Sequence, residues 1–194
     1  MGTDLRRTLR IVLPVALLVS VVGGWALSRS SDDVDANLTD PGVVQTPGIG
    51  TNPKLVGRKL EFRQVEDVAT GAMVTIRPTG KPMVVNFWFS TCEPCKREMP
   101  ELSAAAAKYD GKVQFVGINP NDSRESAQAF IDKYAVKFSV FLDNEGDMVT
   151  AVGLTTFPAT YFLDGDGNIA ATKYGELKPN EIDTILHDTL GVVG

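Results

Sequence analysis

The strongest constraint on the fold is an apolar run at residues 83–89 that passes almost directly into a helix-forming stretch beginning at Cys92. An apolar run without polar alternation is typical of a central β-strand that is covered on both faces. The next residues favour a helix over 93–109, because they include a run of alanines and end at Asp110 and Gly111. This order predicts a strand-to-helix turn in an α/β domain.

Other segments continue the alternation of strands and helices. Strands or hairpins are expected at residues 60–76, 113–118, 138–142 and 159–174, and helices at residues 123–134 and from Pro179 onward. The first hairpin should turn near Thr70 and Gly71. The expected fold class is therefore α/β, with a central mixed β-sheet flanked by helices and an N-terminal β-hairpin extension.

Cys92 and Cys95 are the two cysteines of the chain, and both lie at the strand-to-helix turn. Thiols with this spacing can close into a disulfide and reopen, because N–H groups at a helix N-terminus stabilise a thiolate on the first cysteine. A structural disulfide over so short a loop would stabilise the fold little. A zinc site would need two more ligands, where the chain offers one histidine, His187. A redox-active pair is the favoured interpretation.

Charge and residue spacing also bear on nucleic acids, cofactors and metals. A formal net charge of −5 argues against a nucleic-acid partner. No cofactor is expected beyond the Cys92–Cys95 disulfide. No metal is expected either, because the acidic segment 164–168 lacks the ligand spacing and closing glutamate of a calcium loop and predicts a hairpin turn.

The N-terminus has the pattern of a membrane signal. Three arginines precede an uncharged apolar stretch at residues 11–28, which would span roughly 27 Å as a helix. We expect a signal anchor at 1–28, a flexible linker at 29–53, and a domain at 54–194 on the extracytoplasmic side. A signal peptide cleaved near residues 26–28 and a buried core helix are the alternatives.

Four motifs stand out along the chain: Val-Val-Asn-Phe-Trp at 84–88, Cys-Glu-Pro-Cys-Lys-Arg-Glu-Met-Pro at 92–100, Val-Gly-Ile-Asn at 116–119 and Phe-Pro-Ala-Thr-Tyr-Phe at 157–162. Together with the order of elements, they resemble the membrane-anchored thioredoxin-like proteins of the TlpA/ResA type. The resemblance implies a thioredoxin-like fold and thiol–disulfide oxidoreductase activity. Thr91 departs from the family pattern, which usually has Trp before the first cysteine, and this leaves substrate preference open.

The roles of the catalytic candidates follow from their chemistry. Cys92 should be the more exposed sulfur and the nucleophile, and Cys95 should resolve the mixed disulfide. Ordinary thioredoxins carry a buried Asp at the position of Asn86, whose amide cannot accept and release a proton. Glu98, one turn beyond Cys95, is the expected replacement, and the resemblance also implies a functional glutamate there. The alternative for Glu98 is a solvated surface charge.

Six residues around the cysteine pair are candidates for substrate binding: Trp88, Thr91, Glu93, Pro94, Phe157 and Pro158. The resemblance implies a cis-proline loop at Phe157–Pro158 that faces the cysteines and pairs its backbone with an extended substrate. Trp88 fits the core equally well, and Glu93 fits an exposed charge at the helix start.

The expected function is thiol–disulfide exchange with protein substrates that carry thiols or disulfides. A membrane redox partner is expected to recharge the cysteine pair. By resemblance we favour a reductive role on apocytochrome thiols in cytochrome c maturation; disulfide donation to exported proteins is the alternative. A peroxiredoxin-like thiol peroxidase is disfavoured because Phe89 occupies the place of its Thr or Ser. A copper-binding module would lack nearby His or Met ligands.

Overall fold

The computed structural model describes residues 52–194. The signal anchor expected at 1–28, and the linker expected at 29–53 except for its last two residues, lie outside the described residues. Within residues 52–194, no helix combines the length and the apolar character that a membrane span requires.

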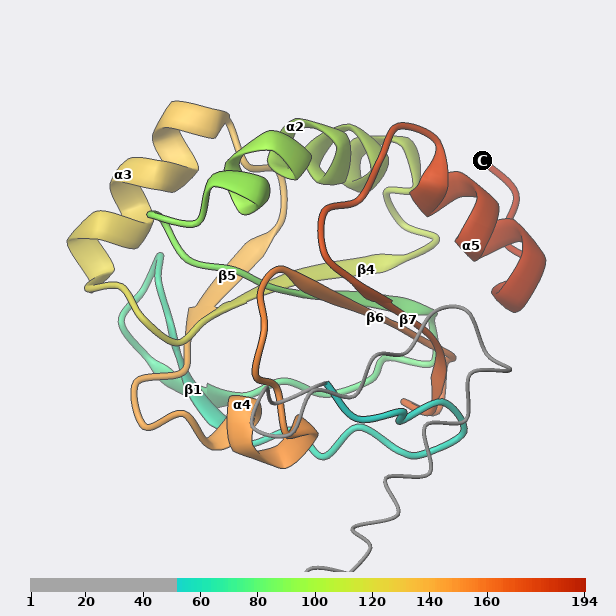
Figure 1. Ribbon diagram of the computed structural model, residues 1–194, viewed down its shortest axis with the longest axis horizontal. Coiled ribbons are helices and arrows are strands. Elements are labelled where there is room, and N and C mark those ends of the chain that lie inside the picture. The colour runs from blue at the N-terminus through green and yellow to red at the C-terminus, as the bar shows by residue number, and fades with distance from the viewer. Residues whose placement is uncertain (1–51) are drawn as a thin grey trace, which may run out of the picture. The chain divides into compact units, whose positions relative to one another are not determined.

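A mixed seven-stranded sheet forms the centre of the described domain, in the order β2-β1-β5-β4-β3-β6-β7 (Figure 1). The strands are β1 (Gln64–Asp67), β2 (Met73–Thr75), β3 (Met83–Phe87), β4 (Gln114–Asn119), β5 (Ser139–Leu142), β6 (Ala159–Leu163) and β7 (Ile169–Tyr174). β3, β4 and β5 run parallel, whereas β6 pairs with β3 in the antiparallel sense. The hairpin β1–β2 joins β5 antiparallel and extends the sheet, as predicted.

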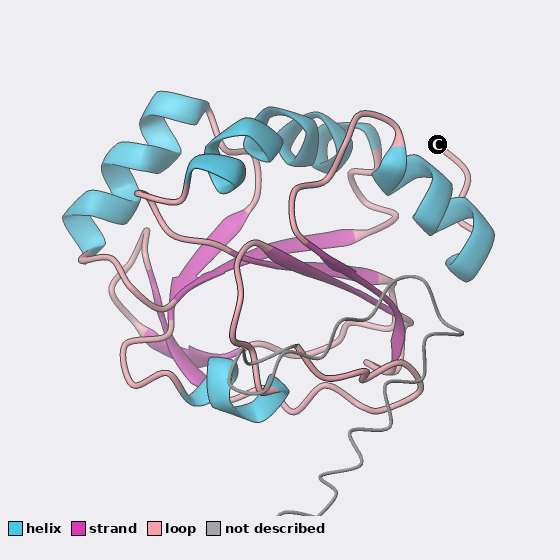
Figure 2. Ribbon diagram, in the orientation of Figure 1, coloured by secondary structure: helices cyan, strands magenta, loops and turns pink. Residues whose placement is uncertain are grey.

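Helices cover both faces of the sheet (Figure 2). The helices are α2 (Glu93–Lys108), α3 (Arg124–Tyr134), α4 (Asp147–Val152) and α5 (Glu181–Leu190). α2, α3 and α5 lie on one face and α4 on the other. The sequence patterns did not predict α4, which has six residues between two glycines in left-handed conformation, Gly146 and Gly153. Two buried side chains, Met148 and Val152, hold this short helix in place.

β3 lies in the interior of the sheet, between β4 and β6, and all of its residues are buried. Val84 packs into the core on one face of the sheet, and Met83 and Val85 pack into a separate core on the other. Each such side chain contributes about 1.5–3 kcal/mol by leaving water. The apolar run predicted this placement correctly, and burial on both faces makes β3 a rigid base for the turn that follows it.

Turn and cap residues in the sequence predicted the positions of several other elements correctly. The first hairpin turns through Gly71, whose φ of 74° lies in the region that glycine tolerates. Ser123 caps α3 by accepting a hydrogen bond from the Ser126 amide at 3.3 Å, as its sequence position indicated. The segment 164–168 is the expected hairpin turn, in which the Asp164 carboxylate accepts from the Asp166 and Asn168 amides.

Candidate active site

Cys92 and Cys95 form a disulfide at the start of α2. Cys92 is the N-cap residue, and its sulfur accepts a hydrogen bond from the Cys95 amide at 3.3 Å. Cys92 is 6% exposed and Cys95 is fully buried, so Cys92 presents the more accessible sulfur, as predicted. The same amide and the N-terminus of α2 would stabilise a thiolate on Cys92 after reduction.

Glu98 lies one turn beyond Cys95 on α2 and is completely buried, which excludes the surface-charge alternative. Its Oε1 accepts a hydrogen bond from Asn86 Nδ2 and its Oε2 accepts one from the Leu177 amide, both at 2.8 Å. Burial raises the pKa of Glu98 to about 7, although both hydrogen bonds favour the charged form. The carboxyl can therefore gain or lose a proton near neutral pH, as proton transfer to a thiol requires.

Asn86 connects Glu98 to the sheet. It lies on β3, and its Nδ2 also donates to Thr160 Oγ1 on β6 at 3.0 Å. The Asn86 Oδ1 is buried without a hydrogen-bond partner. Asn86 therefore holds one oxygen of Glu98 without competing for its proton. Sequence reasoning identified Asn86 and Glu98 separately, but it did not identify the bond between them or the contribution of Thr160.

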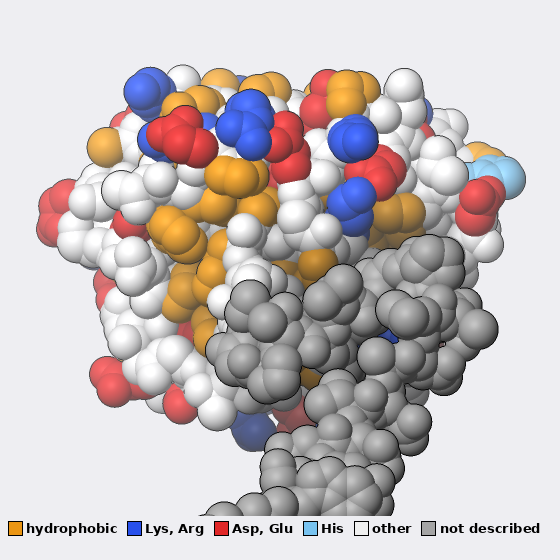
Figure 3. Space-filling model, viewed as in Figure 1, with side chains coloured by type: hydrophobic (Ala, Val, Ile, Leu, Met, Phe, Trp, Pro, Cys, Tyr) orange, Lys and Arg blue, Asp and Glu red, His pale blue; other side chains and the backbone are white. Residues whose placement is uncertain are grey.

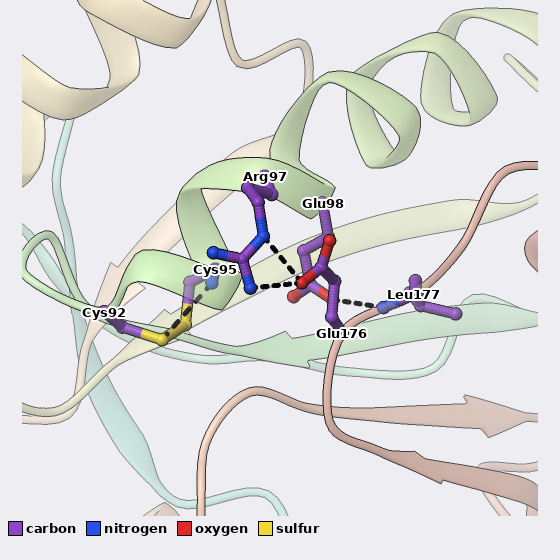
Figure 4. A network of polar contacts seen from close by, with 6 residues as sticks. All are labelled: Cys92, Cys95, Arg97, Glu98, Glu176 and Leu177. Atoms are coloured by element: carbon purple, nitrogen blue, oxygen red, sulfur yellow. Dashed lines mark hydrogen bonds and ion pairs between the residues drawn. A yellow bond between two sulfur atoms is a disulfide. The ribbon is translucent and has the colours of Figure 1, made fainter.

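A second contact lies beside Glu98 and faces solvent (Figure 4). The Nε and Nη2 atoms of Arg97 both donate to Glu176 Oε2, at 2.8 and 2.5 Å. Arg97 precedes Glu98 and Glu176 precedes Leu177, so an exposed ion pair and a buried hydrogen bond run side by side between α2 and the segment before α5. Sequence reasoning missed this pairing, because the partners are 79 residues apart.

The Phe157–Pro158 peptide bond is cis, as the resemblance implied. Pro158 is buried, and the half-buried ring of Phe157 packs edge-on against Phe89, with centroids 5.3 Å apart. Within residues 52–194, no hydrogen bond engages the backbone N–H or C=O of Phe157. The backbone N–H and C=O of Phe157 are therefore free to pair with an extended peptide.

The other substrate-binding candidates divide between surface and core. Thr91 and Glu93 are exposed and Pro94 is half-buried, so all three border Cys92. Glu93 forms an ion pair with Lys96 at 2.6 Å, and this lysine lowers the pKa of the Glu93 carboxyl. Trp88 has no exposed area and belongs to the core, so its assignment to the substrate surface is corrected. Trp88 directly follows β3, and its indole packs inward against Phe130.

The turn before Cys92 is held by Asp122, a residue that the sequence patterns did not single out. Its carboxylate accepts from the Ser90 amide at 2.7 Å and from the Ser90 hydroxyl at 2.8 Å. It also accepts from Asn119 Nδ2 at 2.6 Å, at the end of β4. Three charge-assisted bonds thus tie the cysteine-bearing turn to the neighbouring strand.

The mixed sheet, the disulfide at the start of a helix and the cis-proline loop define a thioredoxin-like thiol–disulfide oxidoreductase. The chain belongs to the Redoxin family, whose match covers residues 65–186. It is 28% identical over 133 residues to thiol-disulfide oxidoreductase ResA of Bacillus thuringiensis, which covers 68% of this chain and 69% of that protein. It is 26% identical over 115 residues to ResA of Bacillus subtilis, covering 59% and 62% of the two chains.

Solved structures agree with this assignment. One is a secreted Mycobacterium tuberculosis disulfide oxidoreductase homologous to E. coli DsbE, with 26% identity, a TM-score of 0.58, and coverage of 67% of this chain and 96% of that one. Another is a putative DsbE from Chlorobium tepidum, with 23% identity, a TM-score of 0.63, and coverage of 72% and 98%. The second supports the fold alone. The Redoxin match and the ResA relatives confirm the resemblance to thiol–disulfide oxidoreductases of the TlpA/ResA type.

Proposed function

We propose that this protein is an extracytoplasmic thiol–disulfide oxidoreductase, tethered by its N-terminal segment, that reduces disulfides in protein substrates. The observation that carries the proposal is the Cys92–Cys95 disulfide on the same helix as a fully buried Glu98 with a pKa of about 7. The location rests on the apolar N-terminal pattern, and it agrees with the secreted M. tuberculosis relative. Apocytochrome Cys-x-x-Cys segments are the proposed clients, because the relatives are ResA proteins.

In the reductive direction the cycle begins with both thiols reduced. The Cys92 thiolate attacks the substrate disulfide, which forms a mixed disulfide and releases one substrate thiolate. Cys95 gives its proton to the Glu98 carboxylate and attacks the Cys92 sulfur. This closes the Cys92–Cys95 disulfide and releases the second substrate sulfur. Two electrons pass to the substrate, and the membrane redox partner must return two electrons to the cysteine pair.

The substrate surface in this proposal consists of the residues that border the exposed side of Cys92. Thr91, Glu93 and Pro94 lie on the helix side, and Phe157 and Pro158 form the loop, in which the free backbone groups of Phe157 would pair with the substrate chain. A main-chain contact of this kind accepts many sequences, as an enzyme for several protein clients requires.

The reduction potential of the cysteine pair tests the proposed direction. We expect the purified domain, equilibrated in glutathione buffers, to have a potential below about −200 mV, in the range of cytosolic reductants. A potential more oxidising than about −150 mV, towards that of DsbA, would contradict the reductive role and favour disulfide donation.

A direct assay tests the proposed clients. The reduced protein should open the disulfide of a synthetic Cys-x-x-Cys-His peptide and become oxidised itself, one protein per peptide. A Cys92→Ser variant is the matched control and should leave the peptide oxidised, because it lacks the attacking sulfur. Failure of the unaltered protein to reduce this peptide would remove apocytochrome segments from the proposal.

A further inference from the structure

A groove that the described mechanism does not use lies between the start of α2 and α3. It is an open depression with a volume of about 320 Å³, and its lining residues are Ser90, Lys96, Ser126, Ala129, Phe130, Lys133 and Tyr134. Ser90 lies two residues before Cys92 and Lys96 one turn after it, so one end of the groove borders the catalytic turn. We call this feature the α3 groove.

The α3 groove is long enough to hold a short peptide in extended conformation. Its five α3 residues have the spacing i, i+3, i+4, i+7, i+8, which places them in a single stripe along the helix. Eight residues of helix rise about 12 Å, a length that about four residues of extended chain would cover. A peptide joined to Cys92 through its own cysteine could therefore continue along α3.

The lining combines an aromatic wall with positive charge. The rings of Phe130 and Tyr134 pack with centroids 4.3 Å apart, and the Lys133 ammonium lies 5.4 Å from the centroid of Tyr134. Figure 3 shows hydrophobic side chains gathered near the start of α2, with charged side chains beside them. Phe130 is buried, so the half-buried Tyr134 ring provides the apolar surface, beside the Lys133 ammonium.

Of the two lysines in the groove, only Lys96 has an ion-pair partner within the described residues. Lys96 is paired with the exposed Glu93, and the nearby Asp122 is engaged by Ser90. Lys133 has no carboxylate within ion-pair distance among residues 52–194, although its charge reaches Glu93 and helps to lower the pKa of that carboxyl. In a chain of net charge −5, a lysine without a direct ion pair in a groove beside the catalytic turn favours an acidic partner.

We infer that the α3 groove binds the substrate segment next to the attacked cysteine and selects an acidic side chain about four residues from it. The inference rests on the proposed function and specifies its substrate class. An acidic side chain at that distance would reach Lys133, while the intervening residues would lie against the half-buried Tyr134 ring.

Two disulfide peptides that differ at one position test this inference. Both carry the same reactive disulfide, and the residue four positions from the attacked cysteine is Glu in one and Lys in the other. We expect the protein to show a KM about two- to fivefold lower for the Glu peptide at low salt, the range of an exposed ion pair. The difference should shrink at about 0.5 M salt, where the charges are screened.

Substitutions at Lys133 identify the residue responsible. Lys133→Glu should reverse the preference between the two peptides, and Lys133→Gln should abolish it. Lys81→Glu is the matched control, because Lys81 is exposed before β3, at the end of that strand remote from Cys92. It changes the net charge equally and should keep the preference of the unaltered protein.

The outcomes separate this inference from the function on which it rests. Equal KM values for the two peptides, or equal effects of the Lys133 and Lys81 substitutions, would overturn the inferred binding of substrate in the α3 groove. They would not contradict the proposed thiol–disulfide oxidoreductase function. Failure to exchange with either peptide and with glutathione disulfide would overturn the proposed function. A Lys133→Glu variant that changes the sedimentation coefficient, or that abolishes binding to anionic lipid vesicles, would assign the groove to a second copy or to a membrane and overturn the inference.

Discussion

Replacing Glu98 by Gln should change how the stability of the protein depends on pH. Burial raises the pKa of Glu98 from 4.5 to about 7 in the folded state. Between these values the folded protein binds more protons than the unfolded chain, so stability is fully present below pH 4.5 and is lost as the pH rises through 7. A shift of this size corresponds to roughly 3 kcal/mol of unfolding free energy.

The structure indicates that the Gln side chain can be accommodated. Leu177 can still donate to its carbonyl oxygen, in place of its present bond to Glu98. The new amide N–H₂ needs an acceptor, and the unpartnered Oδ1 of Asn86 can supply one if the Asn86 amide rotates. The Thr160 hydroxyl can then donate to Asn86 instead of accepting from it.

Urea unfolding of the oxidised proteins between pH 5 and pH 8 measures the effect. The unaltered protein should lose about 2.5 kcal/mol of unfolding free energy relative to Glu98→Gln over this interval, because other groups titrate equally in both. Glu93→Gln, on the exposed side of the same helix, should follow the unaltered protein. Parallel curves for the unaltered protein and Glu98→Gln would refute the argument that burial holds a proton on Glu98.

The same variant tests the catalytic role. Resolution of a mixed disulfide by Cys95 should accelerate with pH around a midpoint near 7 in the unaltered protein, where Glu98 becomes a carboxylate. In Glu98→Gln this midpoint should disappear and the reaction should slow. An unchanged pH profile would show that another group accepts the thiol proton.

Three further substitutions have expected outcomes. Cys95→Ser should trap substrates on Cys92, giving covalent adducts that mass spectrometry detects and reductant removes. Gly117→Ala should lower stability by about 1–3 kcal/mol and alter tryptophan fluorescence, because the new Cβ would lie 2.8 Å from the Trp88 indole nitrogen. Asp122→Ala should lower the free energy of unfolding by about 1.5–3 kcal/mol, measured in urea, since it removes the acceptor of three hydrogen bonds.

Most of the fold could be predicted from local patterns. The apolar run of β3, the Ser123 cap of α3 and the turn at Asp164 are each determined by neighbouring residues, and each has the predicted position. α4 escaped prediction because six residues carry too little periodicity to distinguish a helix from a loop. Burial of its side chains against the sheet supplies the stability that its local helix propensity does not provide.

The site was predicted less completely, and the omissions share a cause. The two cysteines follow from their spacing and their place after a strand. The positions of Trp88 and Glu98 depended on which face of the sheet or helix the rest of the chain would cover. Sequence patterns left both open, and packing placed each in the core.

The amino-acid sequence by itself determined the order of strands and helices and the redox pair at the start of α2, because periodicity, capping and cysteine spacing act between neighbours in the chain. Only the tertiary structure decided the environment of that pair. The Leu177 amide reaches Glu98 across 79 residues, and Arg97 and Glu176 meet beside them. A carboxyl with a pKa of about 7 exists only where distant segments exclude water from it, and no local pattern encodes that exclusion.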